Sequence, residues 1–412
     1  MIKRRVGNGN RKTSRRATIK SRDMFRTAGF IRRHPDFSPT RRIRPSPTSI
    51  VRYAVAGLGH IAQTAVLPAF AHAVRNSRLV ALFSEDPLKR RQVQRQYRVP
   101  MTGSYEEYDE LLRSGKIDAV FIAEPNSLHC DFAVRAAKAG VHVLCEKPLA
   151  VSEEQCRQMI DACERNRVKL MTAYRLHFEH ANLEAIKIVQ SGRIGQPRFF
   201  NSVFGMQARE GIRLQRKLGG GPLLDLGVYC INAARYLFRA EPIEVLALTA
   251  NNGEKRFREV EEMSGALLRF PEERLATFIC SFGAADIANY DVVGTKGVLR
   301  LKNAYEYALP VELQVTVGGK TETRKFKKRD QFGPELLYFS DCVLKDKEPE
   351  PSGVEGLNDV RIVEAIYESA QSGQAVKLKG LRKTSRPSLR QEIRRPPVRK
   401  PRRIRVEAPT RQ

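Results

Sequence analysis

The chain has 412 residues, 42% of them hydrophobic, and a formal net charge of +28. This length allows two domains with a substantial core, and the lack of an apolar run of about 18 residues argues against a membrane span. The seven scattered cysteines include no Cys-x-x-Cys pair, which argues against a metal site or a disulfide framework and favours a reducing compartment.

The positive charge is concentrated at the two ends of the chain. Residues 1–52 carry a net charge of +14 and residues 377–412 a net charge of +12, which leaves +2 for the middle. Neither end shows a hydrophobic period, so we expect a disordered segment over residues 1–50 and a basic Pro/Arg-rich tail over residues 377–412. We interpret both as appendages. They would attract polyanions non-specifically, but with so few aromatic residues they do not predict a nucleic-acid partner.

From residue 51 to residue 173 short apolar strands alternate with amphipathic helices. This alternation is typical of a doubly wound parallel sheet, in which each helix crosses over between neighbouring strands. The predicted strands cover residues 52–56, 79–83, 119–123, 141–145 and 168–173, and the predicted helices cover residues 61–75, 87–97, 106–114, 128–139 and 152–166.

Residues 174–376 have a different pattern, in which extended runs are joined by short turns. The runs predict an open, mostly antiparallel sheet in an α+β domain. They cover residues 244–250, 265–270, 276–282, 290–293, 298–301 and 313–316, with helices predicted over residues 181–191, 228–238 and 355–371.

The turn after the first predicted strand has the spacing of a dinucleotide-binding loop. Gly57 permits a tight turn, Gly59 lets the backbone approach a phosphate, and Ala62 allows the helix to pack closely on the strand. Backbone N–H groups and the helix dipole would then face a pyrophosphate. The residues predicted to bind it are Gly57, Leu58, Gly59, His60 and Ile61.

The residue at the end of the second strand distinguishes NAD from NADP. A carboxylate there would accept hydrogen bonds from a ribose 2′-hydroxyl, whereas a 2′-phosphate requires donors and positive charge. Ser84 occupies this position and Lys89 and Arg90 begin the next helix, which favours NADP. Glu85 and Asp86 follow directly, and a shift of one residue would bring an acid to the position, so NAD stays open as an alternative.

Three residues are candidates for the chemistry. Lys147 follows the strand at 141–145, where the carboxyl ends of parallel strands form the ligand crevice. Asp225 and Tyr229 are four residues apart at a helix start and would share one face. A lysine ammonium can polarise a carbonyl oxygen, and a phenol can exchange the proton. Each also has a structural interpretation: Lys147 as a surface lysine, Asp225 as a helix cap and Tyr229 as a core residue.

These motifs together resemble the Gfo/Idh/MocA oxidoreductases over residues 43–376. Tyr229, where most relatives carry histidine, resembles the glucose–fructose oxidoreductase branch, as do Ser84 with Lys89 and Arg213 before the glycines. The motifs are Gly57-x-Gly59, Pro125-Asn126-Ser-Leu-His129, Glu146-Lys147-Pro148, Tyr174-Arg175 and the Gly-rich stretch that leads to Asp225 and Tyr229.

The resemblance implies an N-terminal Rossmann domain, a C-terminal domain whose sheet face joins subunits into a homodimer or homotetramer, and NADP-dependent oxidation or reduction of a sugar or polyol. Lys147, Asp225 and Tyr229 match the catalytic positions, and Arg44–Pro47 would form an arm over the cofactor. Glu124 stands where relatives carry an apolar residue and is expected to alter the pocket near the nicotinamide. Further cofactor-pocket positions match Tyr105, Asn126, His129, Glu146, Lys147 and Arg175.

Two other functions remain open at this stage. One is a non-catalytic NADP-binding sensor or scaffold, against which the intact Lys147, Asp225 and Tyr229 argue. The other is a dehydrogenase acting on inositol or a cyclic diol. No signal peptide is visible, so we expect a cytoplasmic protein, although the resemblance to an exported enzyme leaves the periplasm open.

Overall fold

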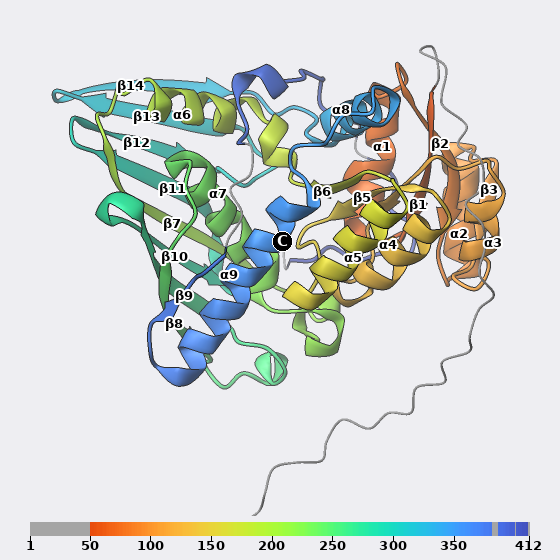
Figure 1. Cartoon of the computed structure of the whole chain (residues 1–412), viewed down its shortest axis with the longest axis horizontal. Helices are drawn as coiled ribbons and strands as arrows, with labels where there is room; N and C mark the ends of the chain where they lie inside the picture. Colours follow the sequence, from red (N-terminus) through yellow and green to blue (C-terminus); the bar gives the residue numbers. More distant parts are fainter. Residues whose placement is uncertain (1–49, 381–385, 400, 411–412) are drawn as a thin grey trace, which may run out of the picture. The chain divides into compact units, whose positions relative to one another are not determined.

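The computed structural model of the chain describes residues 50–380, 386–399 and 401–410, so Arg44–Pro47 and nearly all of the predicted N-terminal segment lie outside them. Two sheets organise the described residues, one in each of the predicted domain ranges (Figure 1). Within this part of the chain no helix combines the length and hydropathy needed to cross a membrane.

The first sheet has six strands in the order β3-β2-β1-β4-β5-β6, and every neighbouring pair is parallel. This is the strand order of the Rossmann fold, whose order reverses beside the first strand. The predicted parallel sheet is therefore confirmed. The strands are β1 (Val51–Ala56), β2 (Ser77–Phe83), β3 (Met101–Gly103), β4 (Ala119–Ile122), β5 (His142–Glu146) and β6 (Leu170–Ala173).

Apolar side chains fill both faces of this sheet. One face is packed by α3 (Tyr108–Arg113), α4 (His129–Lys138) and α5 (Glu153–Arg165). The other face includes α8 (Phe332–Leu344), which returns from the second half of the chain. The hydroxyl of Tyr53 on β1 lies 2.8 Å from that of Ser340 on α8. The first domain is thus completed by a helix that sequence order assigns to the second.

The helix predicted over residues 61–75 is observed as an unbroken helical stretch from His60 to His72 whose type changes along its length. It contains a π-helical turn η1 (Ala62–Val66), a short α1 (Leu67–Ala69) and a 3₁₀ turn η2 (Phe70–His72). Pro68 lies at the start of α1. Proline has no N–H to donate and its ring crowds the carbonyl of the preceding turn, which explains the wider turn before it.

The second sheet has nine strands in the order β14-β13-β12-β11-β7-β10-β9-β8-β15. All neighbouring pairs are antiparallel except β7 with β10, so the predicted mostly antiparallel sheet is confirmed. The strands are β7 (Pro197–Gln207), β8 (Glu244–Ala250), β9 (Met263–Phe270), β10 (Arg274–Ser281), β11 (Gly283–Gly294), β12 (Gly297–Lys302), β13 (Val311–Val317), β14 (Lys320–Phe326) and β15 (Val376–Lys377).

One face of the second sheet packs against helices and the other is open. The packed face meets α6 (His180–Gln190), α7 (Val228–Phe238) and α9 (Gly353–Ser372). On the open face apolar side chains from adjacent strands lie side by side, as in the register pairs Leu246–Leu267 and Leu275–Phe199. The exposed apolar residues of these strands are Phe199, Leu246, Leu248, Leu267, Leu275, Ile279 and Ile287, which we call the open apolar face.

The described part of the C-terminal tail is not an appendage, so that interpretation was wrong for residues 386–399 and 401–410. Arg386 is buried and its guanidinium lies 3.0 Å from the carboxylate of Glu355 on α9. Further along, Glu392 pairs with His180 at 2.7 Å, and Ile404 is buried against the first domain. A buried ion pair, the contact of Glu392 with His180 and an apolar anchor therefore hold a segment that composition alone predicts to be solvated.

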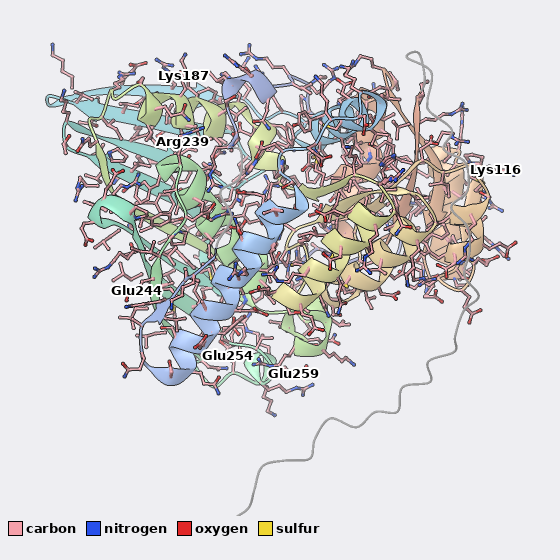
Figure 2. All side chains as sticks on the ribbon, viewed as in Figure 1. Lys116, Lys187, Arg239, Glu244, Glu254 and Glu259 are labelled. Atoms are coloured by element: carbon pink, nitrogen blue, oxygen red, sulfur yellow. The ribbon has the colours of Figure 1, made fainter. Side chains whose placement is uncertain are left out.

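The surface of the folded part carries charge of both signs, as its small net charge predicts. Lys116, Lys187, Arg239, Glu244 and Glu254 project from different elements (Figure 2). All seven cysteines are buried free thiols, and burial raises the pKa of each above its ordinary value.

Candidate active site

The turn after β1 has the backbone geometry that its sequence predicts. Gly57 has a φ of 90°, and a Cβ there would lie 2.5 Å from the carbonyl oxygen of Ala123 at the end of β4. Gly59, in contrast, has no heavy atom within 4 Å of the Cβ position. Gly57 is thus required for the turn itself, whereas Gly59 faces open space where a phosphate can approach the backbone.

The end of β2 presents a serine, and the two nearby acids are engaged elsewhere. The Glu85 carboxylate accepts a hydrogen bond of 2.6 Å from the backbone N–H of Tyr105. Asp86 caps α2 (Pro87–Tyr97) by accepting from the N–H groups of Leu88 and Lys89, both at 3.0 Å. This geometry fits a phosphorylated ribose better than a bare one, because a 2′-hydroxyl lacks its usual acceptor.

Arg90 lies beside the same position. Its Nη1 donates to the backbone carbonyl of Ser84 at 2.8 Å, which holds the guanidinium at the end of β2. Lys89 lies on the same first turn of α2 and is near enough to lower the pKa of Glu124. The predicted residues Ser84, Lys89 and Arg90 are therefore brought together at one end of the crevice.

Glu124 lies near Tyr105 and Lys89, at the end of the crevice where the ribose is expected, and its effect on the pocket near the nicotinamide stays a prediction. Burial raises the pKa of its carboxyl to about 7, and the nearby Tyr105 hydroxyl and Lys89 ammonium oppose that rise. Its Oε1 has no hydrogen-bond partner among the described residues.

His129 and Asn126 hold loops together. The ring nitrogens of His129 lie 2.9 Å from the carbonyl oxygen of Pro148 and 3.0 Å from that of Glu124, and the side chain is fully buried. Asn126 donates to the carbonyl oxygen of Gly219 at 2.8 Å. His129 thus joins the loops after β4 and β5, while Asn126 connects the first domain to the Gly-rich segment.

The central feature is an ion pair across the two domains. Lys147 follows β5, and its Nζ lies 2.8 Å from Oδ1 of Asp225 and 2.8 Å from the Asp225 carbonyl oxygen. Asp225 lies in the π-helical turn η7 (Leu223–Gly227) that leads into α7. Its second oxygen, Oδ2, accepts from Nε of Arg213 at 2.6 Å. Both oxygens of this carboxylate therefore have cationic partners.

The charges of this pair are mutually stabilised. Burial alone would raise the pKa of Asp225, but Arg213 and Lys147 together lower it well below its ordinary value. Burial alone would lower the pKa of Lys147, but the Asp225 carboxylate raises it. Near neutral pH the pair is therefore a carboxylate and an ammonium.

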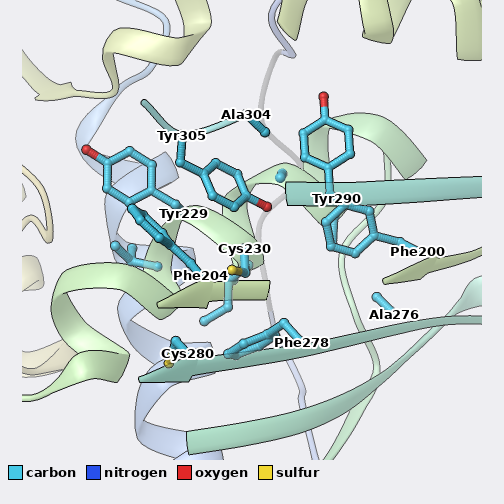
Figure 3. Close-up of a cluster of buried hydrophobic side chains, with 14 of the residues drawn as sticks. Phe200, Phe204, Tyr229, Cys230, Ala276, Phe278, Cys280, Tyr290, Ala304 and Tyr305 are labelled. Atoms are coloured by element: carbon cyan, nitrogen blue, oxygen red, sulfur yellow. The ribbon is translucent and has the colours of Figure 1, made fainter. Parts of the chain in front are cut away.

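Tyr229 completes the group that the sequence predicted. Its ring centroid lies 4.8 Å from Nζ of Lys147 and 5.0 Å from the guanidinium carbon of Arg175. The ring also packs against Phe204 and Tyr305, and its hydroxyl points away from that cluster (Figure 3). Tyr229 is thus both a core residue and a neighbour of two cations, so the two interpretations of the sequence do not exclude each other.

Two more predicted residues have buried side chains beside this group. Arg175 donates to the side chain of Gln331 and to the carbonyl oxygen of Tyr305. Burial raises the pKa of the Glu146 carboxyl to about 7, and its Oε1 has no partner within the described part of the chain. An unpaired buried oxygen next to Lys147 fits a site that a polar ligand completes.

Sequence reasoning did not include Arg213 or Glu335 among the site residues. Arg213 is in the 3₁₀ turn η5 (Ile212–Leu214), twelve residues before Asp225, and its proximity to the glycines was the only available signal. Glu335 on α8 is fully buried, and neither of its oxygens has a hydrogen-bond partner in residues 50–380, 386–399 and 401–410. An isolated glutamate in an apolar helix is the signal that could have identified it.

Two family models match this chain and define the class of protein to which it belongs. Residues 51–174 match an oxidoreductase family described by an NAD-binding Rossmann fold, and residues 182–300 match the GFO/IDH/MocA C-terminal domain. The chain is 32% identical over 283 residues to D-xylose 1-dehydrogenase [NADP(+)] of Haloarcula marismortui, covering 67% of this chain and 78% of the relative. The predicted dinucleotide-binding domain is thereby confirmed.

Two solved oxidoreductase structures are similar to this chain. Aldose-aldose oxidoreductase from Caulobacter crescentus, complexed with glycerol, superposes with a TM-score of 0.76 at 38% identity, covering 80% of this chain and 100% of that one. The 3-ketoreductase KijD10 from Actinomadura kijaniata, in complex with NADP and TDP-benzene, gives 0.72 at 25% identity, covering 78% and 98%. The chain belongs to the Gfo/Idh/MocA family of oxidoreductases.

Proposed function

We propose that the protein is an NADP-dependent oxidoreductase that transfers a hydride between a sugar or polyol carbon and the nicotinamide. The observation that carries this proposal is the ion pair of Lys147 with Asp225, with Tyr229 beside it, at the carboxyl edge of a Rossmann sheet. NADP is supported by Ser84, Arg90 and the engagement of both nearby acids. An aldose is the favoured substrate because the xylose dehydrogenase and the aldose-aldose oxidoreductase named above are relatives.

The residues of the site suggest how the reaction proceeds. Among the described residues, Nζ of Lys147 donates twice, both times to Asp225. An ammonium has three N–H donors, so the third is available to a substrate oxygen. Asp225 keeps the ammonium charged and fixed. When bound, the nicotinamide accepts or supplies the hydride.

Proton movement is assigned to Tyr229. During oxidation, the substrate hydroxyl loses its proton to the ionised Tyr229 oxygen as the hydride leaves the same carbon. During reduction, the neutral phenol donates that proton to the new alkoxide, which Lys147 stabilises. Nζ of Lys147 and the guanidinium of Arg175 lie 4.8 and 5.0 Å from the ring centroid, so two cationic groups are close to the residue that exchanges the proton.

Replacement of Lys147 tests the proposal. Lys147→Met should bind NADP(H) normally but lose turnover of aldoses by at least about 10²-fold, the usual scale of acid–base contributions. Lys116→Met, which changes an exposed lysine, is the matched control and should leave turnover intact. Aldoses, inositol and cyclic diols are screened by the absorbance of reduced cofactor. NADP binding without turnover of any of them would favour the sensor instead.

A further inference from the structure

The last described residues lie against the dinucleotide-binding turn. Gln63, in the turn η1 just after Gly59, exchanges two hydrogen bonds with the backbone of Ile404. Its Nε2 donates to the Ile404 carbonyl at 3.0 Å, and its Oε1 accepts from the Ile404 N–H at 2.8 Å. The same Nε2 donates to the carbonyl oxygen of Leu58 at 2.9 Å. A single buried side chain therefore ties the C-terminal segment directly to the Gly-x-Gly turn.

Three further contacts extend the C-terminal segment across the crevice. Nε of Arg405 lies 2.8 Å from Oδ2 of Asp86, the residue that caps α2 at the end of β2. At the other end, Thr410 forms a β-bridge with Ala208, and the N–H of Arg209 donates to the Pro409 carbonyl at 3.0 Å. The segment thus passes from the nucleotide-binding turn to the end of β7 in the other domain.

The C-terminal segment runs along the expected position of the nucleotide. In Rossmann domains the pyrophosphate lies at the first turn and the adenosine ribose at the end of the second strand. Gln63 contacts the segment at the first position and Asp86 at the second. A nucleotide bound there would lie next to residues 403–407.

The charges of the segment suit a phosphate-bearing ligand. Arg402 and Arg403 are exposed and have no carboxylate partner among the described residues. Burial lowers the pKa of His60 in the turn, and the guanidiniums of Arg213 and Arg403 lower it further, so both cations lie near the turn. Arg213 and Arg405 are paired with Asp225 and Asp86, whereas the guanidiniums of Arg402 and Arg403 remain available to the phosphates of a ligand.

We propose that residues 401–410 form part of the nucleotide site, as a clasp that slows release of the dinucleotide and keeps it bound over successive turnovers. Neither matched family domain reaches these residues, since the second ends at residue 300. The inference depends on nucleotide binding by the Rossmann domain. It does not depend on the sugar substrate or on the catalytic role of Lys147.

The test uses the full chain and measures how fast NADPH leaves it, by displacement with excess NADP⁺ in a stopped-flow fluorimeter. Ile404→Asp should release NADPH at least about 10-fold faster, because a charge replaces the buried anchor. The matched control is Ile393→Asp, which changes a partly buried isoleucine in the tail before the clasp and should not alter release. Equal release rates in wild type and Ile404→Asp, or slower release in the variant, would overturn the clasp.

A second measurement covers the case in which Ile404→Asp fails to fold. Trypsin cleavage after Arg402 and Arg403 is followed by mass spectrometry in the wild-type protein with and without NADP⁺. The clasp predicts that NADP⁺ slows cleavage at both sites several-fold and leaves cleavage after the distant, exposed Arg258 unchanged. Unchanged or faster cleavage after Arg402 and Arg403 would refute it. Binding of NADP⁺ itself is verified separately by calorimetry.

Discussion

Lys147 of the first domain and Asp225 of the second lie 78 residues apart in the chain, yet a hydrogen bond of 2.8 Å joins them. The pair can form only when the two domains pack together. The position of the lysine ammonium is therefore set by the junction between two sheets, and not by the loop after β5 alone.

Asp225→Asn should lower kcat/KM for the aldose substrate by about 10²-fold, since the amide cannot hold the ammonium in place electrostatically. The Asp225 carboxylate raises the pKa of Lys147, so its loss lowers that pKa. The alkaline limb of the pH–rate profile should therefore move to lower pH. Asp291→Asn, which removes an exposed ion pair with Arg300, is the control and should change neither quantity. An unshifted limb would contradict the role of Asp225.

Ser84→Asp should reverse the cofactor preference. The new carboxylate would repel a 2′-phosphate and accept a 2′-hydroxyl, so Kd should rise at least about 10-fold for NADP and fall for NAD. Titration calorimetry with both cofactors measures this directly. Ser114→Asp, at an exposed position after α3, should leave both constants as they are. Tighter binding of NAD than of NADP by the unaltered protein would show that the end of β2 at Ser84 does not select for a 2′-phosphate.

Glu124 should make NADP binding depend on pH. Its carboxyl has a pKa of about 7, raised by burial, so it is largely neutral at about pH 6 and largely ionised at about pH 8. The ionised form lies near Lys89 and the expected 2′-phosphate, which it would repel. Glu124→Gln should therefore bind NADP as wild type does at about pH 6 and several-fold more tightly at about pH 8.

The matched control is Glu146→Gln, whose carboxyl also has a pKa of about 7 but lies beside Lys147. It should retain the wild-type pH dependence of NADP binding. A constant ratio of the Glu124→Gln and wild-type affinities between the two pH values would show that Glu124 does not ionise near the phosphate.

We propose that two copies of the chain associate through the open apolar face. Its leucine, isoleucine and phenylalanine side chains are 37–73% exposed across five adjacent strands, an unusual expanse for a lone subunit. β14 at one sheet edge carries lysine, arginine and glutamate on exposed positions, which discourages pairing along the edge.

Leu248→Glu combined with Ile279→Glu should yield monomers in light scattering. Val74→Glu changes an exposed valine outside the sheet, so this control variant should keep the oligomeric state of the wild type. A monomeric wild-type protein would exclude the proposal.

The local sequence was sufficient to predict an element of the fold where one short segment determines the geometry of that element. The turn at Gly57 and the strand before Lys147 could be predicted because spacing and hydrophobic pattern fix both. The strand β14 could not, since every one of its residues is at least partly exposed and no apolar period marks it. β7 was also missed, because a central strand with a parallel partner depends on pairing with β10, more than 70 residues later.

In the candidate site, too, contacts between distant segments could not be predicted from the local sequence. That Lys147 and Asp225 meet was a hypothesis from their chemistry and from the resemblance, because nothing in the sequence between them determines how the domains pack. The position of Ile404 beside Gln63 was not predictable at all. It depends on one side-chain amide bonding to a backbone 341 residues away.

The burial of all seven native thiols has a practical consequence. A fluorophore that reacts with thiolates should leave the folded wild-type protein unlabelled, since each native thiol is both shielded and hard to ionise. A cysteine introduced at exposed Lys116 would then be the single reactive position, without first removing the others. The protein can therefore be given a reporter dye in one step.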